Sequence, residues 1–264
     1  MLSNRVQNVA YIKILGTENH KKIKIVRLRS VLNSGFEVDK NYISDCVSNN
    51  DCKLDESISR AKSKIFELAF CNNWDYFFTA TLDPSKYDRT NLELFHSDLT
   101  QWLRNQGKKN GKKIDFLLIP ELHSDLKSWH MHGFISGVSI SDLKQFVYGD
   151  KMGQSLVQKV LNGDIVYNWL SYSKKFGFCS LEPIKSPEAV SKYVTKYICK
   201  DLAKSVSEVG AHMYYHSRGL KTSELIKKGM MSAHITPNFE NEYVQIVEIP
   251  FSDEAFKYWL SLID

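Results

Sequence analysis

Two histidines stand one residue apart in the apolar segment "SWHMHGFIS" (residues 128–136). The chain holds eight histidines among its 264 residues, so the pair of His130 and His132 stands out. Residues two apart in a β-strand point to the same face of the sheet, so both imidazoles are expected to project together. Such a pair is a chelate for a divalent metal ion. By itself it is a weak signal, because HxH also arises by chance.

A carboxylate precedes the pair in "PELHSDLKSWHMH", where Glu121 and His123 share one face of another strand-like segment. If the two segments pair as a hairpin, Glu121 can lie across from His130 and His132. One carboxylate and two imidazoles suit Mg²⁺ or Mn²⁺ and leave positions open for substrate. Zinc is less favoured because the group offers no thiolate. We therefore predict a metal site of Glu121, His130 and His132, with His123 as the alternative third ligand.

A later segment, "YVTKYICK", places Tyr193, Tyr197 and Lys200 on one face of a helix, together with Lys196. A tyrosine is a poor nucleophile at its ordinary pKa near 10. A metal that polarises a phosphodiester, and a nearby ammonium group, would supply what attack by a phenolate needs. The ordinary alternative is an amphipathic helix with two half-buried tyrosines.

The elements that must position these residues follow from the spacing of apolar residues. Helices are expected at residues 54–72, 91–107, 139–149, 186–206 and 252–263, and strands at 8–15, 21–32, 74–84, 114–123, 129–137, 176–184 and 243–250, with a weak hairpin near 163–169. Short links between strands favour an antiparallel sheet covered by helices, which is an α+β fold.

Composition sets further bounds. With 43% hydrophobic residues the chain can bury a core, and its net charge of +5 is compatible with a polyanionic partner. The five cysteines form no CxxC pair, which argues against a zinc knuckle and for a reducing cytosol. We expect no signal peptide and no membrane partner, because long apolar segments are missing. A P-loop motif is also missing, so a separate helicase is expected.

Taken in order, "FFTATLDP", "ELH" with "HMH", and "YVTKYICK" resemble the three motifs of HUH endonucleases. They look like the rolling-circle replication initiators (Rep proteins) of small single-stranded DNA phages, plasmids and viruses. The third motif is similar to the two-tyrosine form of microvirus initiators, and the body of the chain resembles filamentous-phage gene II-type replication proteins. The resemblance implies an RRM-like antiparallel sheet with the HUH strand at its centre, a Mg²⁺ or Mn²⁺ site, and site-specific nicking of DNA.

The resemblance also implies a role for each motif residue. It identifies His130 and His132 as the HUH pair, Glu121 as the acidic ligand, Tyr193 and Tyr197 as nucleophiles and Lys200 as the motif lysine. The implied products are a 5′-phosphotyrosyl link and a free 3′-OH, and the implied partners are single-stranded origin DNA, linear or in a hairpin, with host helicase and DNA polymerase in a bacterial cytoplasm. Residues 54–225 would form the endonuclease domain, residues 1–53 an N-terminal extension, and residues 226–264 a strand and helix packing on that domain.

Weaker signals concern contacts to DNA. The predicted contact residues are Thr79, Thr81, Lys196, Arg218 and Lys221, with Tyr214 and Tyr215 nearby for stacking. Two alternatives stay open. One is a transposase or relaxase with the same nuclease site, although relaxases usually place the tyrosine near the N-terminus. The other is a non-catalytic RRM-like nucleic-acid binder, which would show neither a metal requirement nor a covalent DNA adduct.

Overall fold

A computed structural model describes residues 5–29, 31–32, 50–186, 189–190, 193–194, 212–241 and 243–264. The chain divides into two compact units, one of residues 54–69 and 73–220 and the other of residues 1–53, 70–72 and 221–264. Each unit contains an antiparallel sheet with helices, so the predicted α+β class is confirmed. Within the described residues, every helix is too short or too polar to cross a membrane.

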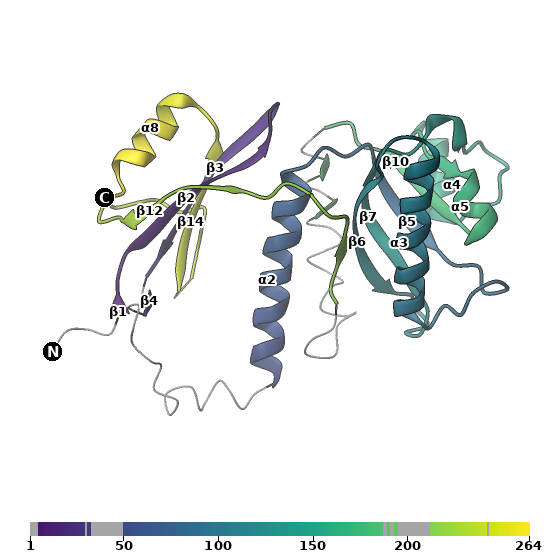
Figure 1. Ribbon diagram of the computed structural model, residues 1–264, viewed down its shortest axis with the longest axis horizontal. Coiled ribbons are helices and arrows are strands. Elements are labelled where there is room, and N and C mark those ends of the chain that lie inside the picture. Colours follow the sequence, from purple (N-terminus) through teal and green to yellow (C-terminus); the bar gives the residue numbers. More distant parts are fainter. Residues whose placement is uncertain are drawn as a thin grey trace. The chain divides into compact units, whose positions relative to one another are not determined.

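The larger unit is built on a seven-stranded antiparallel sheet (Figure 1). Its strands, from one edge to the other, are β11 (Tyr215–His216), β6 (Asp115–Leu122), β7 (Trp129–Ser136), β5 (Tyr76–Thr81), β10 (Cys179–Pro183), β9 (Tyr167–Trp169) and β8 (Leu143–Gln145). The strand that carries His130 and His132 is β7, which is hydrogen-bonded on both sides, as the resemblance implied.

Helices cover both faces of this sheet. On one face, α3 (Leu92–Lys109) buries Phe95, Leu99 and Leu103 in an aromatic core that includes Trp169 and Tyr172. Two shorter helices, α4 (Gln154–Leu161) and α5 (Leu170–Lys175), accompany the β8–β10 edge. On the other face, α2 (Asn50–Phe70) contributes its own apolar row to a separate cluster. The side chains of β7 therefore alternate between two packed layers. Met131 and Ile135 belong to the layer with α3, and Phe134, on the face of His130 and His132, belongs to the layer with α2.

Gly133, directly after His132, allows β6 and β7 to approach each other closely. A Cβ added at Gly133 would collide with the backbone carbonyl of Leu117 on the neighbouring strand. Gly133 pairs with Leu118 on one side and with Phe78 on the other, so the contact lies in the interior of the sheet. A side chain at this position would push β6 away from β7 and disturb the register that faces Glu121 toward His130.

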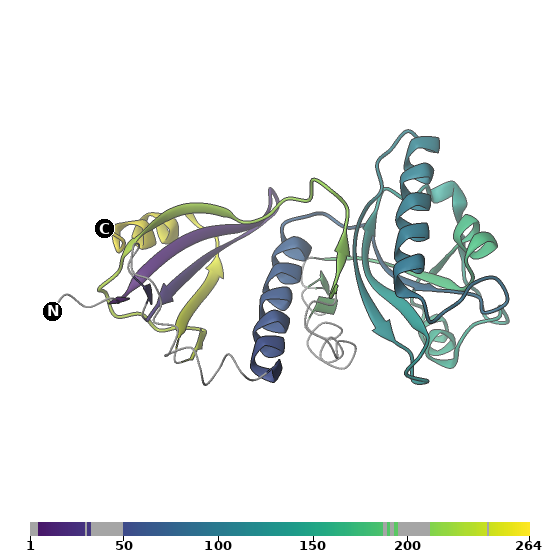
Figure 2. The ribbon, with the colours of Figure 1, turned by 60° about the horizontal axis from the view of Figure 1, so that its bottom comes forward.

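The second unit contains a five-stranded antiparallel sheet (Figure 2). Its order is β12 (Glu224–Met230), β2 (Val9–Thr17), β3 (His20–Leu28), β14 (Val244–Pro250) and β13 (Phe239–Glu240). The amphipathic helix α8 (Asp253–Ser261) packs on it around a core that includes Ile12, Ile25 and Val247. A small two-stranded pair, β1 (Arg5–Val6) with β4 (Val31–Leu32), lies near the N-terminus of the chain.

The structure differs from the sequence prediction at several elements. The helix expected at residues 139–149 is wrong: a 3₁₀ turn at Ile140–Asp142 leads into β8, where backbone pairing with β9 replaces a helix. The helices α4 and α5 and the strand β12 were not predicted. The domain boundaries at residues 53 and 225 stay predictions, but β12 and β14 pair with β2 and β3, so strands from both ends of the chain form one sheet.

Candidate metal centre

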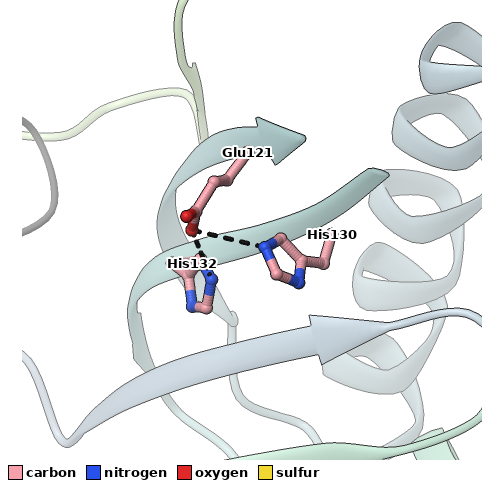
Figure 3. Close-up of side chains that lie close together, drawn as sticks. All are labelled: Glu121, His130 and His132. Carbon is pink, nitrogen blue, oxygen red and sulfur yellow. Dashed lines mark ion pairs between the residues drawn. The ribbon is translucent and has the colours of Figure 1, made fainter. Parts of the chain in front are cut away.

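Three of the predicted ligands converge at one end of the β6–β7 hairpin (Figure 3). Glu121 pairs directly with His130, and His132 lies two residues further along the same face. The Glu121 Oε2 atom is 2.8 Å from His132 Nε2 and 3.3 Å from His130 Nε2. One potential ligand atom from each residue lies within 4.8 Å of the others, so the three can reach a single cation.

The turn that joins β6 to β7 fixes this arrangement. The Asp125 carboxylate accepts hydrogen bonds from the backbone nitrogens of Lys127 (2.9 Å) and Ser128 (2.8 Å) and from the Ser128 hydroxyl (2.6 Å). The backbone nitrogen of His123 donates a hydrogen bond to the Ser128 carbonyl at 2.8 Å and closes the turn. The hydrogen bonds to its carboxylate hold the pKa of Asp125 well below its usual range. The eight residues between Glu121 and His130 therefore form an ordered turn with the ends of the two strands, and Glu121 and His130 still face each other.

The electrostatics of the cluster fit a cation. Burial opposes ionisation of Glu121, but the neighbouring imidazoles of His130 and His132 outweigh it and hold the pKa of Glu121 well below the usual range. The contact with His130 is the poorer one: His130 Nε2 is buried and, at 3.3 Å from the carboxylate, makes no well-aligned hydrogen bond. A buried nitrogen in that state is costly. A cation among the three donors would give it a partner, and the set lacks a thiolate, as Mg²⁺ or Mn²⁺ would prefer.

Thr79 orients one of the ligands, His132, whereas His123 lies outside the converging set. The Thr79 hydroxyl lies 3.1 Å from His132 Nδ1, which leaves Nε2 directed toward Glu121. Thr81 lies on the same strand face, opposite His130. His123, the alternative third ligand, is not among the converging donors, and its Nδ1 atom lies 3.2 Å from the Ser124 hydroxyl. The geometry therefore favours Glu121 over His123.

Tyr193 is connected to the cluster through stacked rings. Its ring stacks on Phe77 with centroids 4.2 Å apart and an interplanar angle of 9°. Phe77 in turn lies parallel to His132, at 6.2 Å and 11°. Val190 and Val194, the neighbours of Tyr193 in the helical segment, are buried in the cluster formed with α2. The other predicted helix residues, Lys196, Tyr197 and Lys200, lie outside the described part of the chain.

The sequence did not single out the partner of the Tyr193 hydroxyl. That hydroxyl donates to Glu182 Oε2 at 3.2 Å, and Lys159 holds the same carboxylate with both contacts at 2.6 Å. Glu182 pairs with Phe77 in the sheet, so it belongs to the same face as Thr79 and the histidines. Period-2 alternation in "CSLEP" is the signal for this face, but it is informative only once β10 is known to pair with β5.

The two remaining predicted DNA contacts lie in different units. Arg218 is exposed in the turn after β11, and its carbonyl accepts a hydrogen bond from Lys113 Nζ at 2.6 Å. Lys221 belongs to the smaller unit, where its backbone nitrogen donates to Asn72 Oδ1 at 2.9 Å. Neither residue lies among the converging metal donors.

Comparison with known proteins gives one match. A family model for replication-associated proteins of the ORF2 and gene II protein type matches residues 75–202, just under half of the chain. The matched range contains the three converging donors and the segment with Tyr193, Tyr197 and Lys200. No curated protein and no solved structure matches the chain. The match supports a role in DNA replication, in agreement with the expected replication initiator.

Proposed function

We propose that this chain is a metal-dependent DNA endonuclease and strand transferase that starts rolling-circle replication by nicking single-stranded origin DNA. The observation that carries the proposal is the convergence of Glu121, His130 and His132 on one sheet face, inside the range matched by a replication-associated family. The described residues around Tyr193 pack on the same face, through Val190 and Val194.

The three donors would hold Mg²⁺ or Mn²⁺, which supplies positive charge against the scissile phosphate and neutralises the charge that develops on it. The chain's own part is to keep the donors in place. The β6–β7 register sets Glu121 opposite His130, and the Thr79 hydroxyl fixes the ring of His132. The side chains of Glu121 and His132 are 26% and 13% exposed, so a phosphate oxygen can reach the cluster from solvent.

The reaction proposed is a transesterification. The phenolic oxygen of Tyr193 or Tyr197 loses its proton and attacks phosphorus, while the bond between phosphorus and the 3′ oxygen breaks. Glu182, which accepts a hydrogen bond from the Tyr193 hydroxyl, would take that proton in this mechanism. The leaving 3′ oxygen gains a proton and becomes the 3′-OH that primes synthesis. Because the 5′-phosphotyrosyl link keeps the phosphodiester energy, the reverse attack rejoins strands without ATP.

Two tyrosines would divide the work in time. One phenol would hold the old 5′ end while the other attacks the newly made origin, and Lys200 would stabilise phosphate or phenolate charge. The protein would act in a bacterial host cytoplasm, where a host DNA polymerase would extend the 3′-OH. A host helicase would separate the strands, because the sequence offers no P-loop of its own.

The test is formation of a covalent adduct with circular single-stranded DNA and Mn²⁺, detected as a protein band that stays bound to DNA in SDS. We expect the wild type, and Tyr148→Phe as a control at an exposed ring, to form the adduct, and EDTA to prevent it. Tyr193→Phe and Tyr197→Phe should each keep some adduct but fail in repeated strand transfer, and the double variant should form none.

The outcomes separate the alternatives. If one single variant loses all adduct and the other behaves as wild type, the enzyme uses one tyrosine. An adduct in the double variant would refute tyrosine attack by this helix. DNA binding without any adduct, and without a metal requirement, would instead identify a non-catalytic nucleic-acid binder.

A further inference from the structure

Two hollows lie on either side of β11, the edge strand of the seven-stranded sheet, and both are lined by His216. The larger, about 680 Å³, is on the α3 side and is bordered by Arg104, Lys108 and Lys112. The smaller, about 530 Å³, is bordered by Arg60 and Lys64 of α2 and by the 212–216 segment. We refer to the two hollows together as the β11 edge.

The charge of the β11 edge has one sign. Neither hollow is lined by an aspartate or a glutamate. Two of its lysines are neutralised by carboxylates nearby, Lys113 by Asp115 at 2.5 Å and Lys64 by Glu67 at 2.7 Å. Three cations at the larger hollow, Arg104, Lys108 and Lys112, form no ion pair within the described part of the chain.

Part of this charge has an ordinary explanation. Lys108 lies in the last turn of α3, where a cation complements the negative end of the helix dipole. Arg104 lies one turn earlier, and Lys112 and Arg218 lie outside the helix. The helix dipole therefore does not account for four cationic side chains around one hollow, and a polyanion does.

Aromatic side chains line both hollows: His96 and His216 the larger one, and Tyr214 and His216 the smaller one. Tyr215 stacks on His96 with centroids 3.7 Å apart and an interplanar angle of 16°. On the other side of the edge, the Tyr214 and His216 rings are parallel to within 18°, with centroids 5.9 Å apart. Cations that follow a phosphate backbone, combined with rings on which bases stack, are the means by which proteins bind single-stranded nucleic acid.

We propose that the β11 edge is a second single-stranded DNA-binding surface, separate from the metal centre. It rests on the proposed function only for the choice of DNA as the polyanion. Phe116, which lines the larger hollow, lies five residues before Glu121 on β6, or roughly 16 Å at the usual rise of a strand. Its side chain also packs on the α3 face, opposite to the face of the metal donors.

This separation determines what the surface does. A nucleotide in the larger hollow cannot also present its phosphate to Glu121, His130 and His132. A strand that occupies both must cross the edge of the sheet over β11, so it engages several nucleotides beyond the scissile phosphate. The β11 edge would then hold flanking DNA while the nick is made, and a short oligonucleotide would be unable to fill both places.

The experiment measures binding of labelled oligo(dT) of 8 and 30 nucleotides by fluorescence anisotropy, in EDTA so that no chemistry occurs. The test variant combines Arg104→Gln, Lys108→Gln and Lys112→Gln, all exposed positions. The control combines Lys151→Gln, Lys174→Gln and Lys175→Gln, which removes the same charge elsewhere in the same unit. We expect the test variant to bind the 30-mer roughly 10- to 100-fold more weakly, with the salt slope reduced by about 2, and the control to change little.

The outcomes distinguish this surface from the proposed function. If the test variant binds oligo(dT) with the affinity and salt slope of the wild type, the proposal that the β11 edge binds DNA is wrong, whatever the adduct assay shows. An equal loss for a 30-bp duplex would overturn its assignment to single strands. If the wild type forms no covalent adduct but the test variant still loses binding, the nuclease proposal fails and the β11 edge stands.

Discussion

The five-stranded and seven-stranded sheets are both antiparallel and both bury aliphatic rows under helices, but they treat polar side chains differently. In the five-stranded sheet, Lys24 pairs with Glu248 of the neighbouring strand at 2.7 Å, so the charges neutralise each other across the ladder. In the seven-stranded sheet, Glu121 faces two imidazoles, one of them without a well-aligned hydrogen bond. A face whose polar groups are left incompletely paired is the face to test for chemistry.

The strongest test of this contrast removes one histidine from each sheet's unit. His132→Ala should lower nicking by at least about 100-fold, because one of three donors is lost and its contact with the Thr79 hydroxyl is lost as well. His234→Ala is the matched control, since His234 is exposed and belongs to the smaller unit. Nicking and thermal unfolding should be measured together. Equal activity of the two variants would contradict the metal centre.

The second test compares the two cores. Leu118→Ala and Ile12→Ala each empty a fully buried aliphatic position, and each should lower the free energy of unfolding by about 2–5 kcal/mol. Leu118 lies in β6, on the face opposite the candidate site, and Ile12 packs in the core of the five-stranded sheet. We expect faster hydrogen exchange in β6 and β7 only for Leu118→Ala, and in β2 and β3 only for Ile12→Ala.

The covalent-adduct assay measures how Leu118→Ala and Ile12→Ala affect function. Ile12→Ala should still form covalent adduct at a temperature where β2 and β3 exchange rapidly, because no residue of the candidate site lies in that sheet. Parallel loss of protection in both sheets in either variant would show that the two units unfold as one, and would remove the comparison.

Elements set by local pattern were predictable, and elements set by distant partners were not. The spacing of His130 and His132 predicted that their side chains share one face, and Met131 between them is fully buried on the opposite face. The strand β12 has the sequence "ELIKKGM", whose alternation is broken by a bulge, and it is stabilised by pairing with β2 more than 200 positions earlier. Glu182 was missed for the same reason, since β10 pairs with β5 about 100 positions away.

A smaller effect concerns the orientation of one ligand. Thr79→Val keeps the shape of the side chain but removes the hydroxyl that lies 3.1 Å from His132 Nδ1. We expect activity at limiting Mn²⁺ to fall roughly 10-fold, and to recover at high Mn²⁺, because the histidine is no longer held in its ligand orientation. Thr81→Val is the control on the same face, opposite His130. If both variants need the same Mn²⁺ concentration as wild type, Thr79 does not orient the ligand.

The smallest effect concerns two phenols, one from each unit. Burial raises the pKa of Tyr172 well above 10, and its hydroxyl donates to the Thr81 carbonyl at 3.2 Å. Tyr172→Phe should therefore lower the free energy of unfolding at pH 7 by about 1 kcal/mol. Burial also raises the pKa of Tyr11 in β2, but that ring is only partly buried, so Tyr11→Phe should change little at pH 7.

The two variants also differ in how stability depends on alkaline pH. With its pKa raised in the folded state, Tyr172 keeps its proton above pH 10 while the unfolded chain releases it, so stability falls as pH rises beyond 10. Phenylalanine has no proton to lose, so Tyr172→Phe should flatten this alkaline decline in urea unfolding between pH 9 and pH 11, and Tyr11→Phe should flatten it less. An unchanged decline in Tyr172→Phe would mean that other tyrosines dominate alkaline unfolding, and that the aromatic core under α3 is more open to water than its packing implies.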